Sequence, residues 1–275
     1  MSEHLKGEDL LDALEAGSVR VAERGADGSW SVNAWVKQEI LAIFAASAVE
    51  SMQWPFIQGH WPDDSGLVAM SFLDKAALAP RRFAAKDGVR IVPGGSAVRR
   101  GAHLARGVIC MPPSYVNVGA FVDEGTLVDS HALVGSCAQI GKRVHLSAGA
   151  QIGGVLEPAN ARPVIIEDEA FIGGNTGVYE GVLVRRGAVL AAGVILTAGT
   201  VVFDVVNKVE LRGTRENPLE IPAGAVVVPG TRPVTQSGPL DLWATHRGLH
   251  IACALIVKYR DDKTDRATAL EQALR

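Results

Sequence analysis

The stretch MPPSYVNVGAFVDEGTLVDSHALVGSCAQIGKRVHLSAGAQIGG, residues 111–154, is rich in glycine and has a Val, Ile or Leu at every sixth position. A helix would need apolar residues spaced by three and four, and an isolated strand would need strict alternation, so neither fits. A period of six is the signature of hexapeptide repeats, which build a parallel β-helix. The period continues beyond this stretch. Its positions are Val92, Val98, Leu104, Cys110, Val116, Val122, Val128, Val134, Ile140, Leu146 and Ile152, then Ile166, Ile172, Val178, Val184, Leu190, Leu196 and Val202, and finally Ile221 and Val227.

Each hexad supplies one short strand and one corner, and three hexads close a triangular coil around the inward aliphatic side chains. Glycines such as Gly119, Gly125 and Gly149 recur three residues after the aliphatic position, where they serve the corners. The two main runs predict about six coils, a prism roughly 25–30 Å tall at the usual inter-strand spacing. Such prisms resemble the left-handed β-helix family, an exception to the right-handed crossover preference.

The expected fold is therefore mainly β, with three segments along the chain. Residues 1–90 are predicted to form a small helical N-terminal cap domain and a link, and residues 91–235 a left-handed parallel β-helix. Residues 236–275 form the C-terminal segment, a strand plus a helix. The breaks in the period predict loops that leave the prism at 154–165 and 203–220, and loops on a rigid scaffold often carry sites.

The two ends of the chain show other patterns. GEDLLDALEAG (7–17) has helical spacing, and SVRVAERGADGSWSV (18–32) predicts two strands that turn at Asp27-Gly28. NAWVKQEILAIFAASAVESM (33–52) predicts an amphipathic helix, with a loop-rich link up to about residue 90. Near the C-terminus, an apolar strand from Leu249 to Tyr259 is expected to precede a helix with a charged face.

Composition excludes several classes of protein. The net charge of −3 lacks the basic excess of nucleic-acid binders. No apolar run approaches the roughly 20 residues of a membrane span, and the N-terminus has no signal-peptide core. Three widely spaced cysteines, Cys110, Cys137 and Cys253, favour small apolar packers in a reduced cytoplasm over disulfides or zinc ligands. We therefore expect a cytoplasmic protein without nucleic-acid or membrane partners.

A prism of short strands has flat outer faces and no central pocket, so ligands must lie in grooves outside it, typically between subunits. Such grooves suit an extended ligand such as the pantetheine arm of coenzyme A. The chain has no phosphate-binding P-loop, because the spacing from Gly135 to Gly141-Lys142 is wrong. Lys258, Arg260 and Lys263 form a small basic patch that is either a phosphate-binding surface or a solvated edge.

Several segments resemble the tetrahydrodipicolinate N-succinyltransferase family. They are SVRVAE, DGSW, NAWVKQEIL, MPPSYVNVGAFVDEGTLVDSHALVGSCAQIGKRVHLSAGAQIGGVLEP, IIEDEAFIG and CALIVKYRDDKT, of which YVNVGAFVDEGTLVDS and GSCAQIGK are the most specific. The resemblance implies that a CoA thioester, acetyl-CoA or succinyl-CoA, acylates the nitrogen of a cyclic lysine-pathway precursor. It also implies no permanently bound cofactor or metal, and a homotrimer whose active sites lie between subunits and are closed by the C-terminal segment.

The resemblance also implies functional residues. Asp129 matches the family's catalytic aspartate, and Glu180 matches a glutamate common to succinyl- and acetyl-transferring relatives. A base is needed because a protonated amine has no lone pair with which to attack the thioester. Asp129 could instead be a corner carboxylate bonded to backbone. The expected substrate-binding residues are Asp123, Glu124, His131, Ser147, Gly154, Glu157, Asn175 and Gly177, and the expected CoA-binding residues are Ala192, Gly193, Thr197, Lys258, Arg260 and Lys263. Asp123 and Glu124 could support the site of Asp129 or simply be solvated.

Three positions depart from the succinyl-transferring pattern. His131 replaces a Trp, and Asn175 and Gly177 replace an Arg and a Glu. The segment FIGGNTGVYEGVLVRRGAVLAAGVILTAGT resembles acetyl-transferring relatives more closely, which slightly favours acetyl-CoA as the donor. The alternatives are a strict N-succinyltransferase of lysine biosynthesis and a paralogue that acylates a related amino-dicarboxylate in secondary metabolism, as in tabtoxin-type pathways. His131 or His145 could also act as the base.

A more distant alternative is a zinc enzyme. The γ-type carbonic anhydrases share this prism and bind zinc between subunits through three histidines, a part for which His103, His131 and His145 are candidates. The family-specific segments argue against it. An ice-binding prism would need rows of threonine on one face, and the exposed positions here are mixed.

Overall fold

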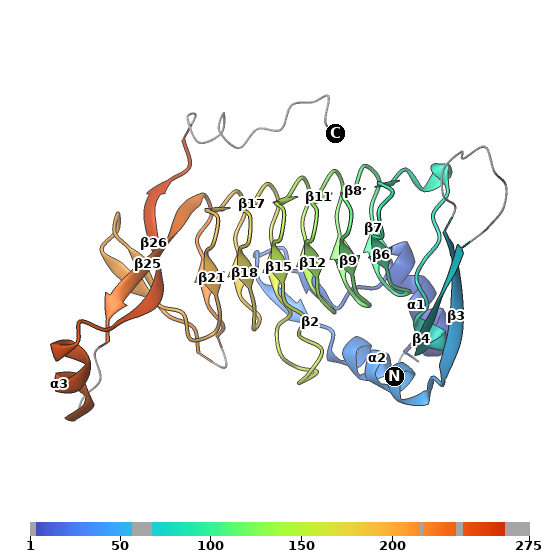
Figure 1. The fold of residues 1–275 in the computed structure, drawn as a ribbon, viewed down its shortest axis with the longest axis horizontal. Helices are drawn as coiled ribbons and strands as arrows, with labels where there is room; N and C mark the ends of the chain where they lie inside the picture. Colours follow the sequence, from blue (N-terminus) through green and yellow to red (C-terminus); the bar gives the residue numbers. More distant parts are fainter. Residues whose placement is uncertain (1–3, 57–67, 215–216, 235–238, 262–275) are drawn as a thin grey trace.

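A computed structural model describes residues 4–56, 68–214, 217–234 and 239–261. The chain forms a left-handed parallel β-helix, as the hexapeptide period predicts. The N-terminal helices and a β-hairpin lie at one end of this prism, and the C-terminal strands and a short helix lie at the other (Figure 1).

Three sheets form the faces of the prism, and each coil contributes one strand to each sheet. The covered face consists of β7 (His103–Leu104), β10 (Phe121–Val122), β13 (Gln139–Ile140), β16 (Ile165–Ile166), β19 (Leu183–Val184) and β24 (Glu220–Ile221). The open face consists of β6 (Ala97–Val98), β9 (Tyr115–Val116), β12 (Leu133–Val134), β15 (Gln151–Ile152), β18 (Gly177–Val178) and β21 (Ile195–Leu196). The long face begins with β5 (Arg90–Ile91), β8 (Ile109–Cys110), β11 (Leu127–Val128), β14 (His145–Leu146), β17 (Phe171–Ile172), β20 (Val189–Leu190) and β25 (Ala225–Pro233).

The second residue of each two-residue strand points into the prism and stacks on its equivalent in the next coil. Val122 pairs with Ile140 eighteen residues further on, so one coil takes three hexads. Both side chains are fully buried in the core cluster. Burying an aliphatic side chain of this size stabilises the fold by about 1.5–3 kcal/mol, which makes the stacked column the main source of stability.

Both interruptions in the period leave the core register intact. Ile140 pairs with Ile166, so eight extra residues leave the prism between β15 and β16 without displacing the inward column. The second excursion lies between β21 and β24. It contains an antiparallel pair, β22 (Val202–Asp204) and β23 (Val209–Leu211).

The N-terminal segment begins as its sequence predicts. It contains α1 (Gly7–Ala16), the antiparallel strands β1 (Ala22–Arg24) and β2 (Trp30–Val32), and α2 (Ala34–Ala46). Helix α1 ends at Gly17, whose φ of 74° is the left-handed conformation that glycine adopts at helix ends. The apolar faces of these elements form a second core with Val118 and Cys137 of the prism.

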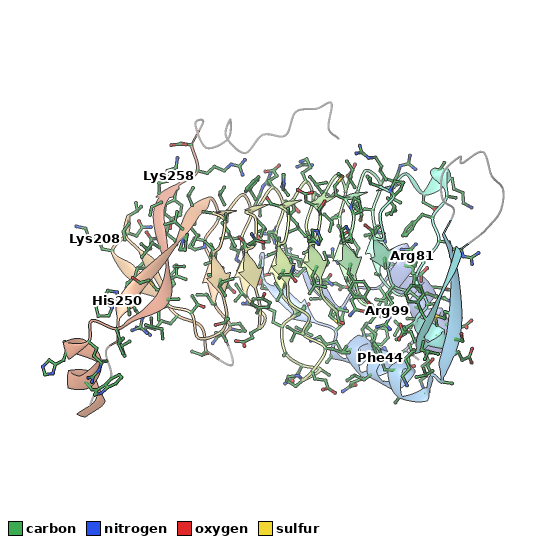
Figure 2. All side chains as sticks on the ribbon, viewed as in Figure 1. Phe44, Arg81, Arg99, Lys208, His250 and Lys258 are labelled. Carbon is green, nitrogen blue, oxygen red and sulfur yellow. The ribbon has the colours of Figure 1, made fainter. Side chains whose placement is uncertain are left out.

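The prediction for residues 47–90 was wrong in part. Helix α2 stops at Ala46 instead of reaching Met52, and β3 (Val49–Phe56) pairs antiparallel with β4 (Val68–Lys75) where a helix end and a loop were expected. Two 3₁₀ turns follow, η1 (Ala76–Leu78) and η2 (Ala85–Asp87). The two strands follow each other directly in the chain, with Val49 opposite Lys75 and Phe56 opposite Val68. Arg99 holds it to the prism through an ion pair with Asp74, and also lies over the ring of Phe44 (Figure 2).

The C-terminal strand was predicted almost to its bounds. β26 (His250–Tyr259) runs antiparallel to β25 and parallel to β22, and extends the long face. The short helix α3 (Pro239–His246) precedes it and was not expected. The helix expected after the strand lies outside the described residues. Among the described helices, none has the length and apolar character that crossing a membrane requires.

Candidate functional site

The predicted site residues occupy the three edges of the prism, where the chain turns from one face to the next. The Asp129 edge joins the long face to the open face and comprises the corners 111–113, 129–131, 147–149, 173–175 and 191–193. The Glu180 edge joins the open face to the covered face and includes the corners 135–137, 179–181 and 197–199. The Asp123 edge joins the covered face to the long face and includes the corners 123–125, 141–143, 167–169 and 185–187.

The Asp129 edge gathers six of the predicted residues in one vertical stack, because each corner lies one coil above the last. Backbone hydrogen bonds lock the corners together: Gly149 N donates to Ser130 O at 2.8 Å, and Gly193 N donates to Gly174 O at 3.0 Å. The residues on this edge are Asp129, His131, Ser147, Asn175, Ala192 and Gly193.

Asp129 is half-buried at the start of its corner. Its Oδ1 accepts a hydrogen bond from Ser130 N at 2.7 Å, which fixes the carboxylate, and its other oxygen accepts none from the described residues. His131 and Asn175 are exposed and have φ values of 61° and 54°. The same left-handed conformation recurs at corners on the other edges, for example at Cys137 and Arg143, so it belongs to the corner geometry of the repeat. The Asp129 edge thus carries a fixed carboxylate and an imidazole on one corner, and an amide two coils further on.

Four further predicted residues line a cavity of about 1210 Å³ on the Glu180 edge. The cavity lies beneath the first excursion loop and is also bounded by Trp30 and Asn217. Glu180 Oε2 accepts a hydrogen bond from Ala198 N at 2.8 Å, which holds the carboxylate at its corner. The four residues are Gly154, Glu157, Glu180 and Thr197.

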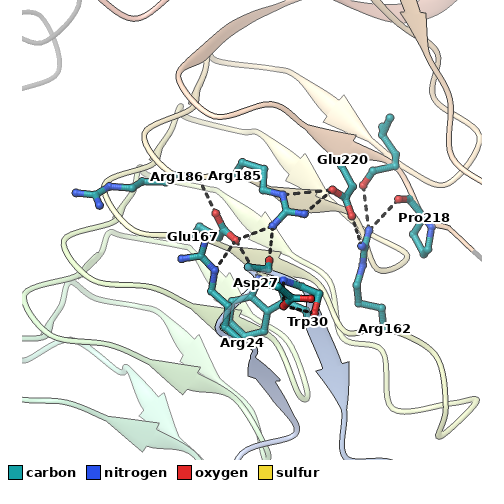
Figure 3. A network of polar contacts seen from close by, with 12 residues as sticks. Arg24, Asp27, Trp30, Arg162, Glu167, Arg185, Arg186, Pro218 and Glu220 are labelled. Carbon is teal, nitrogen blue, oxygen red and sulfur yellow. Dashed lines mark hydrogen bonds and ion pairs between the residues drawn. The ribbon is translucent and has the colours of Figure 1, made fainter.

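Arg162 fixes the walls of this cavity. Its Nε donates to Gly181 O at 2.8 Å, its Nη2 to Pro218 O at 2.8 Å, and its Nη1 to Glu220 Oε1 at 2.6 Å. One guanidinium thus joins the first excursion loop, the Glu180 corner and the second excursion. Figure 3 shows its contacts with Pro218 and Glu220. Sequence reasoning missed Arg162, because an arginine in a polar loop looks the same in a sequence whether it is solvated or bonded to the protein.

The N-terminal segment supports the same walls. Trp30 Nε1 donates to Glu167 Oε1 at 3.0 Å, and Arg185 bridges Glu167 and Glu220 (Figure 3). Lys37 of α2 is fully buried and its Nζ donates to Ala161 O at 2.7 Å, so it holds the loop from beneath. Burial lowers the pKa of Lys37. Sequence reasoning missed Lys37 because it looks like an ordinary polar-face residue of an amphipathic helix.

The structure separates Asp123 and Glu124 from Asp129. They lie one hexad earlier and hence on the Asp123 edge, where Glu124 forms an ion pair with Lys142 at 3.4 Å. Within one chain they cannot support Asp129 directly. The sequence could have shown this separation, because each hexad carries the chain to the next edge and only every third hexad returns it to the same edge.

The predicted basic patch also lies away from the Asp129 edge. Arg260 Nη1 donates to Glu169 O and Gly187 O on the Asp123 edge, at 3.0 and 3.2 Å. Lys258, labelled on strand β26 in Figure 2, forms an exposed ion pair with Asp261 at 3.1 Å. Lys263 lies outside the described residues. The patch is thus partly engaged with the protein itself.

The three histidines considered as zinc ligands do not meet within the chain. His103 lies on the covered face and bonds to Glu15 O at 2.8 Å, and His145 lies on the long face against Phe171. His131 stands on the Asp129 edge. Within the described ranges, no three His, Cys, Asp or Glu side chains are grouped closely enough to hold a metal ion.

The cysteines are buried, as expected for apolar packing. Burial raises the pKa of Cys110 and Cys137 to about 12, which keeps both thiols protonated at neutral pH.

Family models match two parts of the chain. The model described as "Tetrahydrodipicolinate N-succinyltransferase N-terminal" matches residues 7–45, and "Hexapeptide repeat of succinyl-transferase" matches residues 163–198. A Bradyrhizobium diazoefficiens protein named 2,3,4,5-tetrahydropyridine-2,6-dicarboxylate N-succinyltransferase is 46% identical over 270 residues, covering 98% of this chain and 88% of the relative. A Nitrobacter hamburgensis protein of the same name is 43% identical over 275 residues, with 96% and 87% covered.

A solved structure supports the fold. A Campylobacter jejuni chain that carries the name of a 2,3,4,5-tetrahydropyridine-2-carboxylate N-succinyltransferase superposes with a TM-score of 0.50 at 18% identity. The match covers 92% of this chain and 64% of that longer one. At this identity the likeness establishes a shared architecture, the prism with its N-terminal helices.

Proposed function

Because the chain belongs to the tetrahydrodipicolinate N-succinyltransferase family, we propose that it transfers the succinyl group of succinyl-CoA to the nitrogen of tetrahydrodipicolinate. The observation that carries the proposal is 46% identity to a curated succinyltransferase over 98% of the chain, from the N-terminal helices through the prism. The acetyl preference predicted from residues 171–200 is not supported, since the relatives bear the succinyltransferase name. The strict N-succinyltransferase alternative fits better.

The chemistry assigns a role to Asp129. Tetrahydrodipicolinate is a cyclic imine whose nitrogen carries no hydrogen, so one water first adds across its C=N bond and gives an amine. The amine nitrogen attacks the thioester carbonyl, a C–N bond forms, the C–S bond breaks and CoA leaves as the thiol or thiolate. The proton that the nitrogen loses needs an acceptor, and the unengaged oxygen of Asp129 supplies one. The hydrogen bond from Ser130 N holds the carboxylate in place, so no reorganisation is needed when the proton moves.

The donor is proposed to lie along the upper corners of the Asp129 edge. Ala192 and Gly193 are exposed there and carry almost no side chain, which leaves the backbone open to an extended pantetheine arm. Ser147, Asn175 and His131, on lower corners of the same edge, are proposed to contact the acceptor.

The second group of residues, around Glu180, lies on the other side of the open face. We therefore propose a homotrimer in which the Asp129 edge of one subunit meets the Glu180 cavity of the next, so that each site draws on two chains. Hydrophobic Ile195, half exposed on the open face between the two edges, supports burial of this face against a neighbour.

Thiol release by the purified protein tests the proposed reaction. With tetrahydrodipicolinate present, succinyl-CoA is expected to be consumed with a kcat/KM at least about tenfold above that for acetyl-CoA. The product mass should show one succinyl group and one water added to the acceptor. A preference for acetyl-CoA would restore the donor predicted from residues 171–200. Absence of release with both donors would contradict the proposed reaction.

A further inference from the structure

Tyr179 lies flat against the open face, over two glycines. A Cβ atom added at Gly177 would lie 2.8 Å from the Tyr179 hydroxyl oxygen and 2.9 Å from its Cζ, and one added at Gly153 would lie 2.7 Å from its Cδ1. These distances are well inside van der Waals contact. The absence of side chains at Gly177 and Gly153 therefore makes room for the ring, and the hydroxyl reaches back over β18 toward the Asp129 edge.

The hydroxyl of Tyr179 has no hydrogen-bond partner within the described part of the chain. The hydroxyls of the other two tyrosines are engaged: Tyr115 donates to Asn117 Oδ1 at 3.4 Å, and Tyr259 donates to Asp204 Oδ2 at 2.6 Å. Tyr179 is half-buried and lines the Glu180 cavity. Its phenolic O–H is thus a positioned donor that faces solvent space.

The cavity offers little positive charge to an anionic ligand. Among its described lining residues, Arg162 is the one cation, and its guanidinium is engaged by Gly181 O, Pro218 O and Glu220. Glu157 and Glu180 line the same space. A carboxylate that enters there must be recognised chiefly by neutral hydrogen-bond donors.

We propose that Tyr179 is a specificity-determining residue that donates its phenolic hydrogen to the distal carboxylate of the succinyl chain. This inference rests on the proposed function. The position of Tyr179 supports this role. Tyr179 N donates to Leu196 O at 2.9 Å, so the ring lies beside β21, and the residues that flank β21, Gly193 and Thr197, are proposed CoA-binding positions. A hydrogen bond to a charged group discriminates strongly against ligands that lack the charge.

Calorimetric binding of succinyl-CoA and butyryl-CoA, which has the same chain length without the carboxylate, tests the inference. The wild-type protein should bind succinyl-CoA at least about tenfold more tightly, and Tyr179→Phe, which removes only the hydroxyl, should reduce that preference by about tenfold. Tyr115→Phe is the matched control on the same face and should leave the preference intact. If the Tyr179 substitution only disturbed the structure, it would weaken the binding of both thioesters equally and leave the ratio of their dissociation constants unchanged.

Gly177→Ala provides an independent test, because its methyl group would displace the Tyr179 ring without removing the hydroxyl. It should reduce the succinyl preference as Tyr179→Phe does. A wild-type protein that binds and transfers succinyl-CoA, with Tyr179→Phe and Gly177→Ala both retaining its preference, would overturn the role of Tyr179 and leave the proposed function standing. Failure of the wild-type protein to bind either thioester would overturn both.

Discussion

Gly135 stands where the first excursion loop leaves the prism, and the backbone of Gly154 packs directly against it. A Cβ atom added at Gly135 would collide with Gly154 N and lie 2.7 Å from Gly153 C. The obstacle is backbone, which cannot rotate away as a side chain can. The close approach of these corners thus fixes the point from which the cavity-forming loop departs.

We expect Gly135→Ala to lower the free energy of unfolding by about 1–3 kcal/mol, the usual effect of overpacking. Gly199→Ala is the control, since a Cβ atom there meets only Thr197 Oγ1 at 4.0 Å and should change stability by less than about 1 kcal/mol. Urea unfolding of both variants measures the difference. Equal effects would contradict the close approach at Gly135.

At this scale the sequence predicts part of the site. The grouping of Asp129 with Asn175 follows from hexad arithmetic, because both follow long-face strands. Asp123 and Glu124 come one hexad before Asp129, and one hexad carries the chain from one edge of the prism to the next, so nearness in sequence does not put them on the Asp129 edge. The position of the Tyr179 ring over Gly177 could not be predicted, because the orientation of an aromatic side chain depends on the space that the neighbouring coils leave for it.

Between elements, an ion-pair network fastens the excursion loops to the prism. Arg185 Nη2 lies 2.8 Å from Glu220 Oε2, and Arg162 Nη1 lies 2.6 Å from Glu220 Oε1. Burial opposes ionisation of Glu220, but the hydrogen bonds from the two arginines outweigh it and lower its pKa. Glu220 is thus the shared anchor for both loops that wall the cavity.

The lowered pKa predicts a pH dependence. A carboxylate with a depressed folded-state pKa stabilises the fold above its unfolded value, about 4.3 for Glu, and loses that contribution as the pH falls through the folded-state value. Glu220→Gln should therefore have a lower free energy of unfolding than wild type at pH 7, and this difference should become smaller below about pH 4. Urea unfolding of both proteins at pH 7 and pH 3.5 measures the difference. A difference that does not change with pH would contradict the ionised role of Glu220.

The coils of the prism could be predicted from the sequence, but the hairpin and the buried cations could not. Each inward residue of the prism repeats at a fixed interval, so a local pattern suffices for the coils. The hairpin β3–β4 was missed because apolar residues at its described end, Val49, Phe72 and Leu73, are exposed, so no alternation of buried and exposed residues marks the strands there. Arg162 and Lys37 were missed because buried cations satisfied by carbonyls have no sequence period.

For the whole molecule, the proposed trimer explains why functional residues occupy two edges. A ring of three subunits repeats one heterologous contact, so the Asp129 edge of each chain can meet the Glu180 cavity of its neighbour. The N-terminal segment already occupies the covered face, where Gln139, Ile165 and Leu183 are buried. The open face remains available for this contact.

Mixed trimers test the shared site. Asp129→Asn and Glu180→Gln are each expected to be nearly inactive, but co-expression of the two should restore about a quarter of wild-type activity, because one interface in four combines the intact edge with the intact cavity. Sedimentation should show three chains per particle. Sites contained within single chains would give no recovery on mixing.

The most direct measurement is thiol release from succinyl-CoA in the presence of tetrahydrodipicolinate, with wild-type protein and Asp129→Asn side by side. We expect turnover by the wild type and a loss of at least about 10²-fold in the variant, with an unchanged melting temperature. The Asn side chain can still accept the hydrogen bond from Ser130 N, so the corner should keep its shape. Turnover by Asp129→Asn near the wild-type rate would contradict the role of Asp129 as the proton acceptor.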